Sequence, residues 1–267
     1  MKRAPAVAHQ FYPGDPATLR STLERLIPST ATKQKALAVV SPHAGYIYSG
    51  SVAGETFAAV EIPQDIVLLG PNHHGYGAPV ALMHTGSWSL PLGEVQINTV
   101  LAQILLALTD LIEPDTLAHR FEHSLEVQVP FLQYFRPDMT LTPMVICHLS
   151  FKACQTVGEA LADAIRKYDK PVLIVASSDM THYESRESAT AKDSLAIRRL
   201  EALDPEGLYN TVLDKGITMC GIMPATIALV AALRLGATRA RLIRYTDSGE
   251  ASGDTNQVVG YAGMVIS

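Results

Sequence analysis

The sequence predicts one α/β domain over residues 1–267, with a mixed, largely parallel central sheet flanked by helices. Three short runs, at 36–40, 66–69 and 172–176, are apolar and rich in Val, Ile and Leu, which is typical of strands covered on both faces. Segments with helical spacing separate these runs, as in a chain of strand–helix–strand units. Hydrophobic residues make up 48% of the 267, so the chain is long enough to bury a large core.

Local signals place the elements of the first half in order. Asp15 is the expected cap of a first helix, with Pro16 at the first helical position. After the strand at 36–40, the pattern predicts a helix over 51–60, a strand over 66–69, a hairpin across 79–90 and a helix over 98–108. Residues 121–135 form a helix candidate that Pro130 interrupts.

The second half continues the alternation of strands and helices. The pattern predicts, in order, a strand over 141–147, a helix over 151–168, a strand over 172–176, helices over 185–203, 205–213 and 223–235, and two final strands. The Gly-rich, polar segment 247–257 is expected to be a long surface loop.

Charge and composition exclude several classes of partner. The formal net charge is −5 and there is no long Lys/Arg run, so we expect neither nucleic acid nor an anionic membrane surface as a partner. The longest apolar run, 227–233, is far below the roughly 20 residues that cross a bilayer. The first ten residues lack the apolar stretch of a signal peptide, and three cysteines are an odd number. We therefore expect a protein of the reducing cytoplasm.

Histidines follow strand-like runs in three segments that lie far apart in the chain. These segments are SPHAGYIYSG around His43, LLGPNHHGYG around His73 and His74, and SSDMTHY around Asp179 and His182. Loops that leave the carboxyl ends of parallel strands meet over one crevice, so side chains distant in sequence converge there. The sequence therefore predicts a single site assembled at the strand ends.

A metal is the ligand that this set of donors favours. His43 and either His73 or His74 offer imidazoles, which suit zinc, copper, iron or nickel. Two such ligands are rarely enough, and the candidates for a third donor are the carboxylates of Asp179, Glu122 and Glu126 and the thiol of Cys220. Cys220 directly precedes a predicted helix, whose N-terminus is expected to lower the pKa of the thiol.

The motifs PHAGYIYSG, GPNHH, EHSLEVQVPF, SSDMTH and TMCG, in this order and at these separations, closely resemble the Memo family over essentially the whole chain. The resemblance implies the fold of the LigB-type class III extradiol dioxygenases, non-haem iron enzymes that cleave catechol rings. Matched motif by motif, it implies that His43, His73 and Cys220 are metal ligands, for Fe(II) first and for zinc or copper as alternatives. Because a cysteine stands where a glutamate completes the triad of the ring-cleaving enzymes, catechol cleavage does not carry over directly.

The same resemblance implies roles for three further residues. His182 would be the acid/base near bound oxygen and substrate, Asp179 would orient it, and His123 would line the pocket. These roles describe a dioxygenase-like oxidoreductase acting on a small molecule whose identity the sequence leaves open. His74 is expected to lie behind the ligands. The remaining histidines and cysteines are expected to have packing or surface roles: His9, His84, His119, His148, Cys147 and Cys154.

Two alternatives stay open at this point. In the first, the cleft is vestigial and binds a peptide or a partner protein, since Memo-like proteins of animals are described as signalling adaptors. Related microbial proteins often accompany an AMMECR-type protein and a radical-SAM enzyme, which are the partners that the resemblance implies. In the second alternative, the ligands hold zinc, and His182 or Asp179 activates a bound water for hydrolysis.

Overall fold

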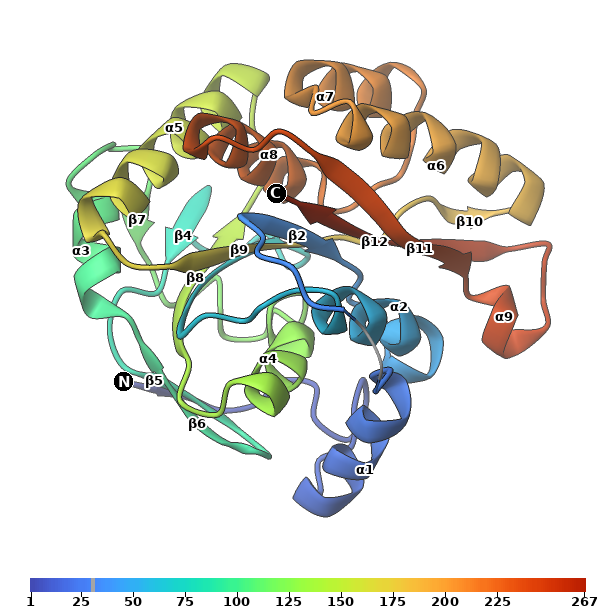
Figure 1. Cartoon of the computed structure of the whole chain (residues 1–267), viewed down its shortest axis with the longest axis horizontal. Helices are drawn as coiled ribbons and strands as arrows, with labels where there is room; N and C mark the ends of the chain where they lie inside the picture. Colours follow the sequence, from blue (N-terminus) through green and yellow to red (C-terminus); the bar gives the residue numbers. More distant parts are fainter. Residues whose placement is uncertain (30–31) are drawn as a thin grey trace.

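The computed structural model describes residues 1–29 and 32–267. Within these residues, the strands join in one sheet of twelve strands (Figure 1). Along the main path of the sheet lie β1 (Lys2–Arg3), β5 (Ser87–Leu90), β6 (Gly93–Ile97), β8 (Thr140–Ile146), β3 (Asp65–Pro71), β9 (Val172–Ser177), β2 (Ala38–Ser41), β12 (Val258–Ile266) and β10 (His182–Glu184). Off this path, β11 (Ala240–Asp247) pairs with β12, and β4 (Val80–Leu82) pairs with β8 and with β7 (Glu113–Pro114).

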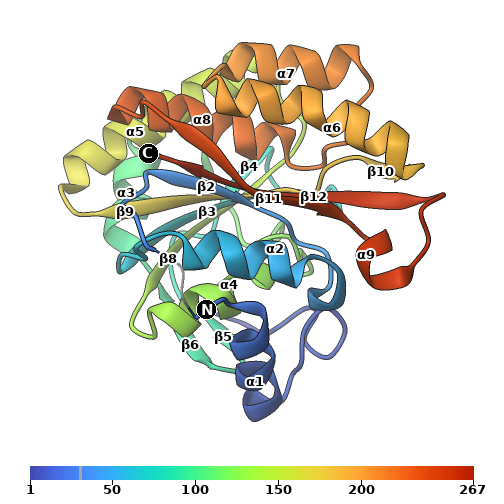
Figure 2. The same cartoon turned by 45° about the vertical axis from the view of Figure 1, so that its right-hand side comes forward.

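Helices cover both faces of the sheet. One face carries α3 (Thr99–Leu106), α5 (Phe151–Tyr168), α6 (Arg186–Glu201), α7 (Pro205–Asp214) and α8 (Ile222–Leu235). The other carries α1 (Pro16–Leu26), α2 (Tyr46–Ala58) and α4 (Val129–Phe135), as Figure 2 shows. A short α9 (Gly249–Ser252) and a 3₁₀ turn, η1 (Glu126–Gln128), complete the elements. Among the helices of the described residues, none combines the length and the apolar character needed to cross a bilayer.

Burial on both faces explains why the central strands read as continuous apolar runs. In β2, Val39 joins the core under α1, α2 and α4, whereas Val40 joins the core under α5 and α8. In β9, Val175 and Ala176 divide between the two cores in the same way. Successive strand residues point to opposite faces, so a strand between two helical layers needs apolar side chains at every position.

The parallel register of the central strands aligns their carboxyl ends. Ser41 of β2 pairs with Ser177 of β9, and Leu69 of β3 pairs with Ala176 of β9. On the far side, Pro71 of β3 pairs with Ile146 of β8. Four strands therefore end level with one another, and the loops that follow them start at one edge of the sheet.

The predicted α/β fold with a mixed, largely parallel sheet flanked by helices is confirmed, and the helix over 151–168 has the bounds that the pattern predicted. Four local predictions were wrong. Helix α2 begins at Tyr46 rather than at 51, and the hairpin is β5–β6, where Gly93 adopts a positive φ of 131°. Residues 121–125 are not helical. Pro130 does not interrupt a helix but lies in the first turn of α4, where its missing N–H costs nothing. Segment 247–257 contains α9 as well as loop.

The N-terminal segment is fastened to the loop that precedes η1 by one buried carboxylate. Glu126 is 0% exposed, and its two oxygens accept hydrogen bonds from Arg3 Nη1 (2.6 Å), Ala6 N (2.7 Å), Val7 N (3.0 Å) and Tyr12 Oη (2.7 Å). Arg3 also donates to the carbonyl oxygen of Glu122 at 2.7 Å. Because these donors compensate the charge of the Glu126 carboxylate in its buried position, the contact fixes the backbone of the loop that precedes η1.

Replacing Arg3 by methionine should lower the free energy of unfolding by about 3–5 kcal/mol, because the Glu126 carboxylate would stay buried without its counter-charge. Lys2→Met is the matched control, since Lys2 and its partner Glu94 are both exposed and should contribute little. Urea titrations of both variants measure the difference. Equal destabilisation by the two substitutions would contradict this role of Arg3.

A second buried polar group makes the fold sensitive to acid. His119 is 1% exposed, and its Nε2 donates to the carbonyl oxygen of Ala81 at 3.0 Å. Its Nδ1 has no hydrogen-bond partner among the described residues. Burial lowers the pKa of His119 to about 4, because a charged imidazole would lose its hydration there.

Below about pH 6.5 the unfolded chain binds a proton at His119 that the folded chain does not accept until about pH 4. The contribution of His119 to the free energy of unfolding therefore falls as the pH is lowered from about 6.5 to about 4, by about 3 kcal/mol in total. We expect His119→Gln to lose less stability than wild type between about pH 7 and about pH 4. Urea titrations across this range test it, and parallel losses in the two proteins would show that His119 is not responsible.

Candidate metal centre

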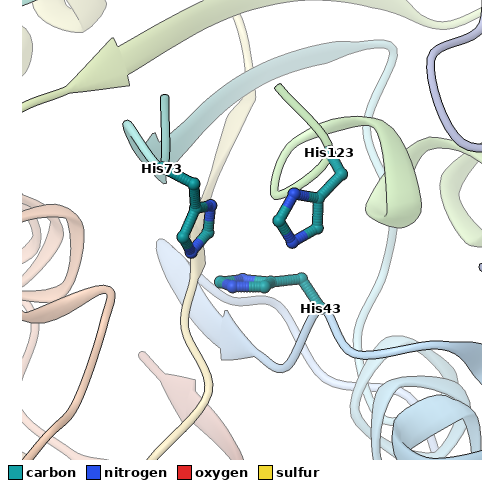
Figure 3. Close-up of side chains that lie close together, drawn as sticks. All are labelled: His43, His73 and His123. Carbon is teal, nitrogen blue, oxygen red and sulfur yellow. The ribbon is translucent and has the colours of Figure 1, made fainter. Parts of the chain in front are cut away.

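Two histidines of the site come from the aligned strand ends and a third from the loop before η1. His43 lies two residues beyond the last residue of β2, and His73 lies two residues beyond the last residue of β3. His123 enters from the loop that Glu126 fastens. Figure 3 shows the three rings gathered together, and each offers one nitrogen such that all three atoms lie within 4.8 Å of one another.

A serine fixes which nitrogen of His43 carries the proton. His43 Nδ1 lies 2.9 Å from Ser177 Oγ, and that hydroxyl already donates its single hydrogen to the carbonyl oxygen of Ser124 at 2.6 Å. Ser177 also accepts from Gln128 Nε2 at 2.8 Å. His43 Nδ1 must therefore be the donor, which leaves Nε2 as an unprotonated lone pair. Burial, followed by the nearby His123 and His73, holds the pKa of His43 well below its usual value.

A buried carboxylate does the same for His73. Glu122 Oε1 accepts from His73 Nδ1 at 2.8 Å and from Ser124 N at 2.9 Å, while its Oε2 accepts from His73 N at 2.7 Å. Burial alone would raise the pKa of Glu122, but the hydrogen bonds from His73 and Ser124 hold it well below its usual range. The ionised carboxylate accepts the hydrogen bond of Nδ1–H, so the proton stays on Nδ1 and the lone pair of the neutral His73 ring is at Nε2.

His123 is the less firmly held member of the cluster. Its ring stacks on His73 with centroids 4.5 Å apart and an interplanar angle of 24°, and it contacts Phe11 at 4.7 Å. Its Nδ1 lies 3.5 Å from Glu122 Oε1. Burial and the neighbouring His73 lower the pKa of His123 to about 4, so its imidazole is a neutral donor at neutral pH.

Cys220 and Asp179 border the cluster on the side of β9. Cys220 Sγ lies 3.3 Å from His43 Nε2 and accepts a hydrogen bond from Asp179 N at 3.3 Å. Asp179 Oδ1 accepts from His43 N at 2.7 Å, and its Oδ2 lies 4.0 Å from His43 Nε2. Burial raises the pKa of Asp179 to about 6, against the opposing hydrogen bond from His43.

His182 lies at the start of β10 and presents a free nitrogen. Its Nδ1 donates to the carbonyl oxygen of Thr218 at 2.9 Å, and its backbone N donates to Thr218 Oγ1 at 2.7 Å. The lone pair is again at Nε2, because a carbonyl oxygen only accepts.

The donor set fits a transition metal. Neutral imidazoles with an oriented Nδ1–H and a free Nε2 are the form in which histidine binds metals. Two nitrogens at about 2.1 Å from one ion are at most about 4.2 Å apart, so the cluster needs only a small contraction to hold one. His43, His73 and His123 can therefore hold a metal ion.

Comparisons with known proteins identify the family of this chain. The model of the family described as Memo-like protein matches residues 3–265. The chain belongs to the Memo family. MEMO1 family proteins of Methanopyrus kandleri and Aquifex aeolicus are 40% and 42% identical to it, over 100% and 99% of this chain and 99% and 98% of their own lengths. A third, from Methanothermobacter thermautotrophicus, is 39% identical over 98% of this chain and 99% of its own.

A solved structure shares the fold with this Memo family chain. An uncharacterised protein of Escherichia coli K12 superposes with a TM-score of 0.55, covering 86% of this chain and 100% of its own. Its sequence is only 15% identical, so the likeness extends to the fold alone.

The structure brings His43, His73 and His123 together and places Cys220 and Asp179 against His43, whereas His182 contacts Thr218 and Tyr183. It also changes three assignments. Glu126 is not a ligand candidate, because its carboxylate is taken up by the N-terminal segment. His74 is exposed and bonds to the carbonyl oxygen of Phe121, away from the cluster. Burial raises the pKa of Cys220, opposite to the lowering expected from the helix N-terminus, because desolvation outweighs the dipole.

Sequence reasoning missed the residues that orient the histidines. Ser177 and Phe11 each lie far along the chain from the histidine that they contact, and Gln128 in turn donates to Ser177. Only Ser177 had a sequence signal, because it stands at the end of a predicted strand beside Asp179. In this Memo family chain the ligand candidates follow from the motifs and the resemblance, whereas the hydrogen-bond partners of the histidines required the folded structure.

Glu122→Gln should weaken metal affinity by about 10–100-fold, because all three hydrogen bonds to this side chain need an acceptor and an amide nitrogen cannot accept. Glu113→Gln, on an exposed strand, is the control. Competition with a chelator of known affinity measures the change. Equal affinities of the Glu122 variant and wild type would exclude this carboxylate as the group that orients His73.

Proposed function

We propose that this Memo family protein is a non-haem metal enzyme, in which His43, His73 and Cys220 hold Fe(II) and the site carries out oxygen-dependent oxidation of a small organic molecule. The single observation that carries the proposal is the distance of 3.3 Å between Cys220 Sγ and His43 Nε2. A sulfur at about 2.3 Å and a nitrogen at about 2.1 Å from one ion, at an angle of about 90–109°, are about 3.1–3.6 Å apart. The two atoms are thus spaced as neighbouring ligands.

The third histidine supports a role beside the metal. His73 and His123 are stacked nearly parallel, whereas His43 and His73 meet edge to face at 76°. His43 also meets His123 edge to face, at 82°, so both His73 and His123 are arranged to share an ion with His43. His123 therefore completes the cluster as an alternative donor, or as a neutral base next to the ligands.

Two further groups favour catalysis over a purely structural metal. Structural zinc sites are closed by four protein ligands and need no acid or base beside them. Here the carboxyl of Asp179, whose pKa burial raises to about 6, borders His43 and Cys220, and His182 keeps a free Nε2 that can accept a proton. A bound Fe(II) would supply Lewis acidity and an electron for reaction with oxygen.

The chain's own residues would then move the protons. His182 Nε2 accepts a proton from a substrate hydroxyl, because its Nδ1 proton is held by Thr218. Asp179 keeps the loop after β2 in place through the backbone of His43, and so holds the ligand while the proton moves. The fastened loop of His123 and Phe11 closes the opposite side of the site.

Metal content of anaerobically purified protein, measured by elemental mass spectrometry, tests the proposal. We expect stoichiometric iron in wild type and its loss in His43→Ala, His73→Ala and Cys220→Ser. His148→Ala is a matched control, because His148 also lies two residues beyond a parallel strand but is exposed. His182→Ala should keep the metal and lose oxygen uptake with phenolic substrates, since it is not a ligand.

Other outcomes decide between the remaining readings. Zinc alone, lost in the same three variants, would replace oxidation by metal-assisted hydrolysis. No metal under any loading condition would overturn the enzyme proposal and favour a cleft that binds a peptide or a partner protein. Loss of metal from His182→Ala would show that His182 is a ligand rather than an acid/base.

A further inference from the structure

The loop over residues 179–182, which follows β9, is held at each of its backbone N–H groups by a different part of the chain. The acceptors of these N–H groups, in the order of the donors, are Cys220 Sγ (3.3 Å), Gly260 O (2.8 Å), Asp193 Oδ1 (3.0 Å) and Thr218 Oγ1 (2.7 Å). Backbone donors in a loop without regular structure need such partners. The places of Asp179 and His182 therefore depend on contacts with residues far along the chain.

One of these acceptors is a fully buried carboxylate. Asp193, in α6, is 0% exposed, and its Oδ1 accepts from both Thr181 N (3.0 Å) and Thr181 Oγ1 (2.6 Å). Its Oδ2 accepts from Tyr245 Oη of β11 at 2.8 Å. Hydrogen bonds to a carboxylate are roughly twice as strong as those between neutral groups. Asp193 thus joins the middle of the loop to a helix and to a strand of the sheet.

A glycine in β12 leaves the room that this carboxylate needs. A Cβ at Gly260 would lie 2.1 Å from Asp193 Oδ2 and 3.1 Å from Met180 Cβ. The same glycine pairs with the loop, because its N donates to Thr181 O at 2.9 Å. A glycine inside a strand marks a place where other groups approach the backbone closely. Here the loop and the carboxylate of Asp193 both lie against β12.

The loop that Asp193 holds leads directly to the metal-ligand candidates. Asp179 Oδ1 accepts from His43 N at 2.7 Å, and His182 Nδ1 donates to the carbonyl oxygen of Thr218 at 2.9 Å. Thr181 lies between Asp179 and His182, so a displacement of Thr181 would move the residues on both sides of it. The hydrogen bonds of Asp193 go to Thr181 and Tyr245, so Asp193 acts on the centre through this loop.

We propose that Asp193 is a positioning residue of the centre. Through Thr181, its carboxylate fixes the loop so that His182 keeps its proton on Nδ1 and its lone pair at Nε2. Tyr245 holds the carboxylate in the rotation that this contact needs. The inference rests on the proposed function, in which Nε2 of His182 accepts the proton of the substrate.

The protonated nitrogen of the His182 ring tests this role without any turnover. Long-range ¹H–¹⁵N spectra report it, and His182→Ala identifies the signals; protein purified with zinc in place of iron avoids paramagnetic broadening. We expect the Nδ1-protonated form in wild type and its loss in Asp193→Ala, because an imidazole released from Thr218 favours the proton on Nε2. Asp193→Asn should restore the wild-type form, since its amide oxygen can accept from Thr181 and its nitrogen can donate to Tyr245.

Asp65→Ala is the matched control for the loss of a buried carboxylate. Asp65 is 6% exposed and accepts from Thr140 Oγ1 at 2.6 Å and from Asn98 Nδ2 at 2.8 Å. It stands at the first residue of β3, at the opposite end of that strand from His73. We therefore expect Asp65→Ala to lower stability but to keep the Nδ1-protonated form of His182.

A smaller change keeps the test decisive if Asp193→Ala does not fold. Thr181→Val removes the hydroxyl that donates to Asp193, whereas Thr181→Ser keeps it. The amide of residue 182 should exchange its hydrogen about tenfold faster in Thr181→Val than in Thr181→Ser. Equal exchange rates in these two variants would contradict the role of Asp193.

Three results of the nitrogen measurement would overturn the proposal. They are a proton on Nε2 of His182 in wild type, an unchanged Nδ1-protonated form in Asp193→Ala, and an equal loss of that form in Asp65→Ala. A wild-type protein that takes up no oxygen, but whose His182 responds to Asp193 as expected, would refute the proposed function and support the positioning role. The two failures are thus distinct.

Discussion

The alignment of four parallel strand ends is the constraint on which the rest of this structure depends. Because Ser41, Ser177 and Pro71 end neighbouring strands, the residues two positions further on, His43, Asp179 and His73, are delivered to one place. Hydrophobic burial on both sheet faces sets this register, since a slip of one residue would exchange the side chains of the two cores. The site is thus a consequence of core packing, and its geometry is as rigid as the sheet.

Buried acceptors orient two histidines of the candidate metal centre. Ser177 and Glu122 accept hydrogen bonds from Nδ1 of His43 and of His73, which leaves the lone pair of each ring at Nε2. The loop that brings Glu122 and His123 has no regular structure until η1, and the Arg3–Glu126 contact supplies the rigidity that helical bonds do not.

Much of the fold and the ligand candidates could be predicted from the sequence, because strand-like runs followed by histidine are local patterns. The partners could not. Glu122 and Glu126 are four residues apart and equally acidic, yet one orients His73 and the other anchors the N-terminal segment, a choice made by contacts about 50 and 120 residues away. The helix N-terminus at Cys220 predicted a lowered pKa, but burial, which no local pattern shows, raises it.

The central claim is that His43, His73 and Cys220 surround one metal ion. X-ray absorption spectroscopy of the iron-loaded protein measures the neighbours of that ion directly. We expect one sulfur neighbour at about 2.3 Å together with nitrogen or oxygen neighbours at about 2.0–2.2 Å, and no sulfur in Cys220→Ser. A spectrum of wild type with imidazole neighbours and no sulfur would contradict the claim and assign the third position to His123.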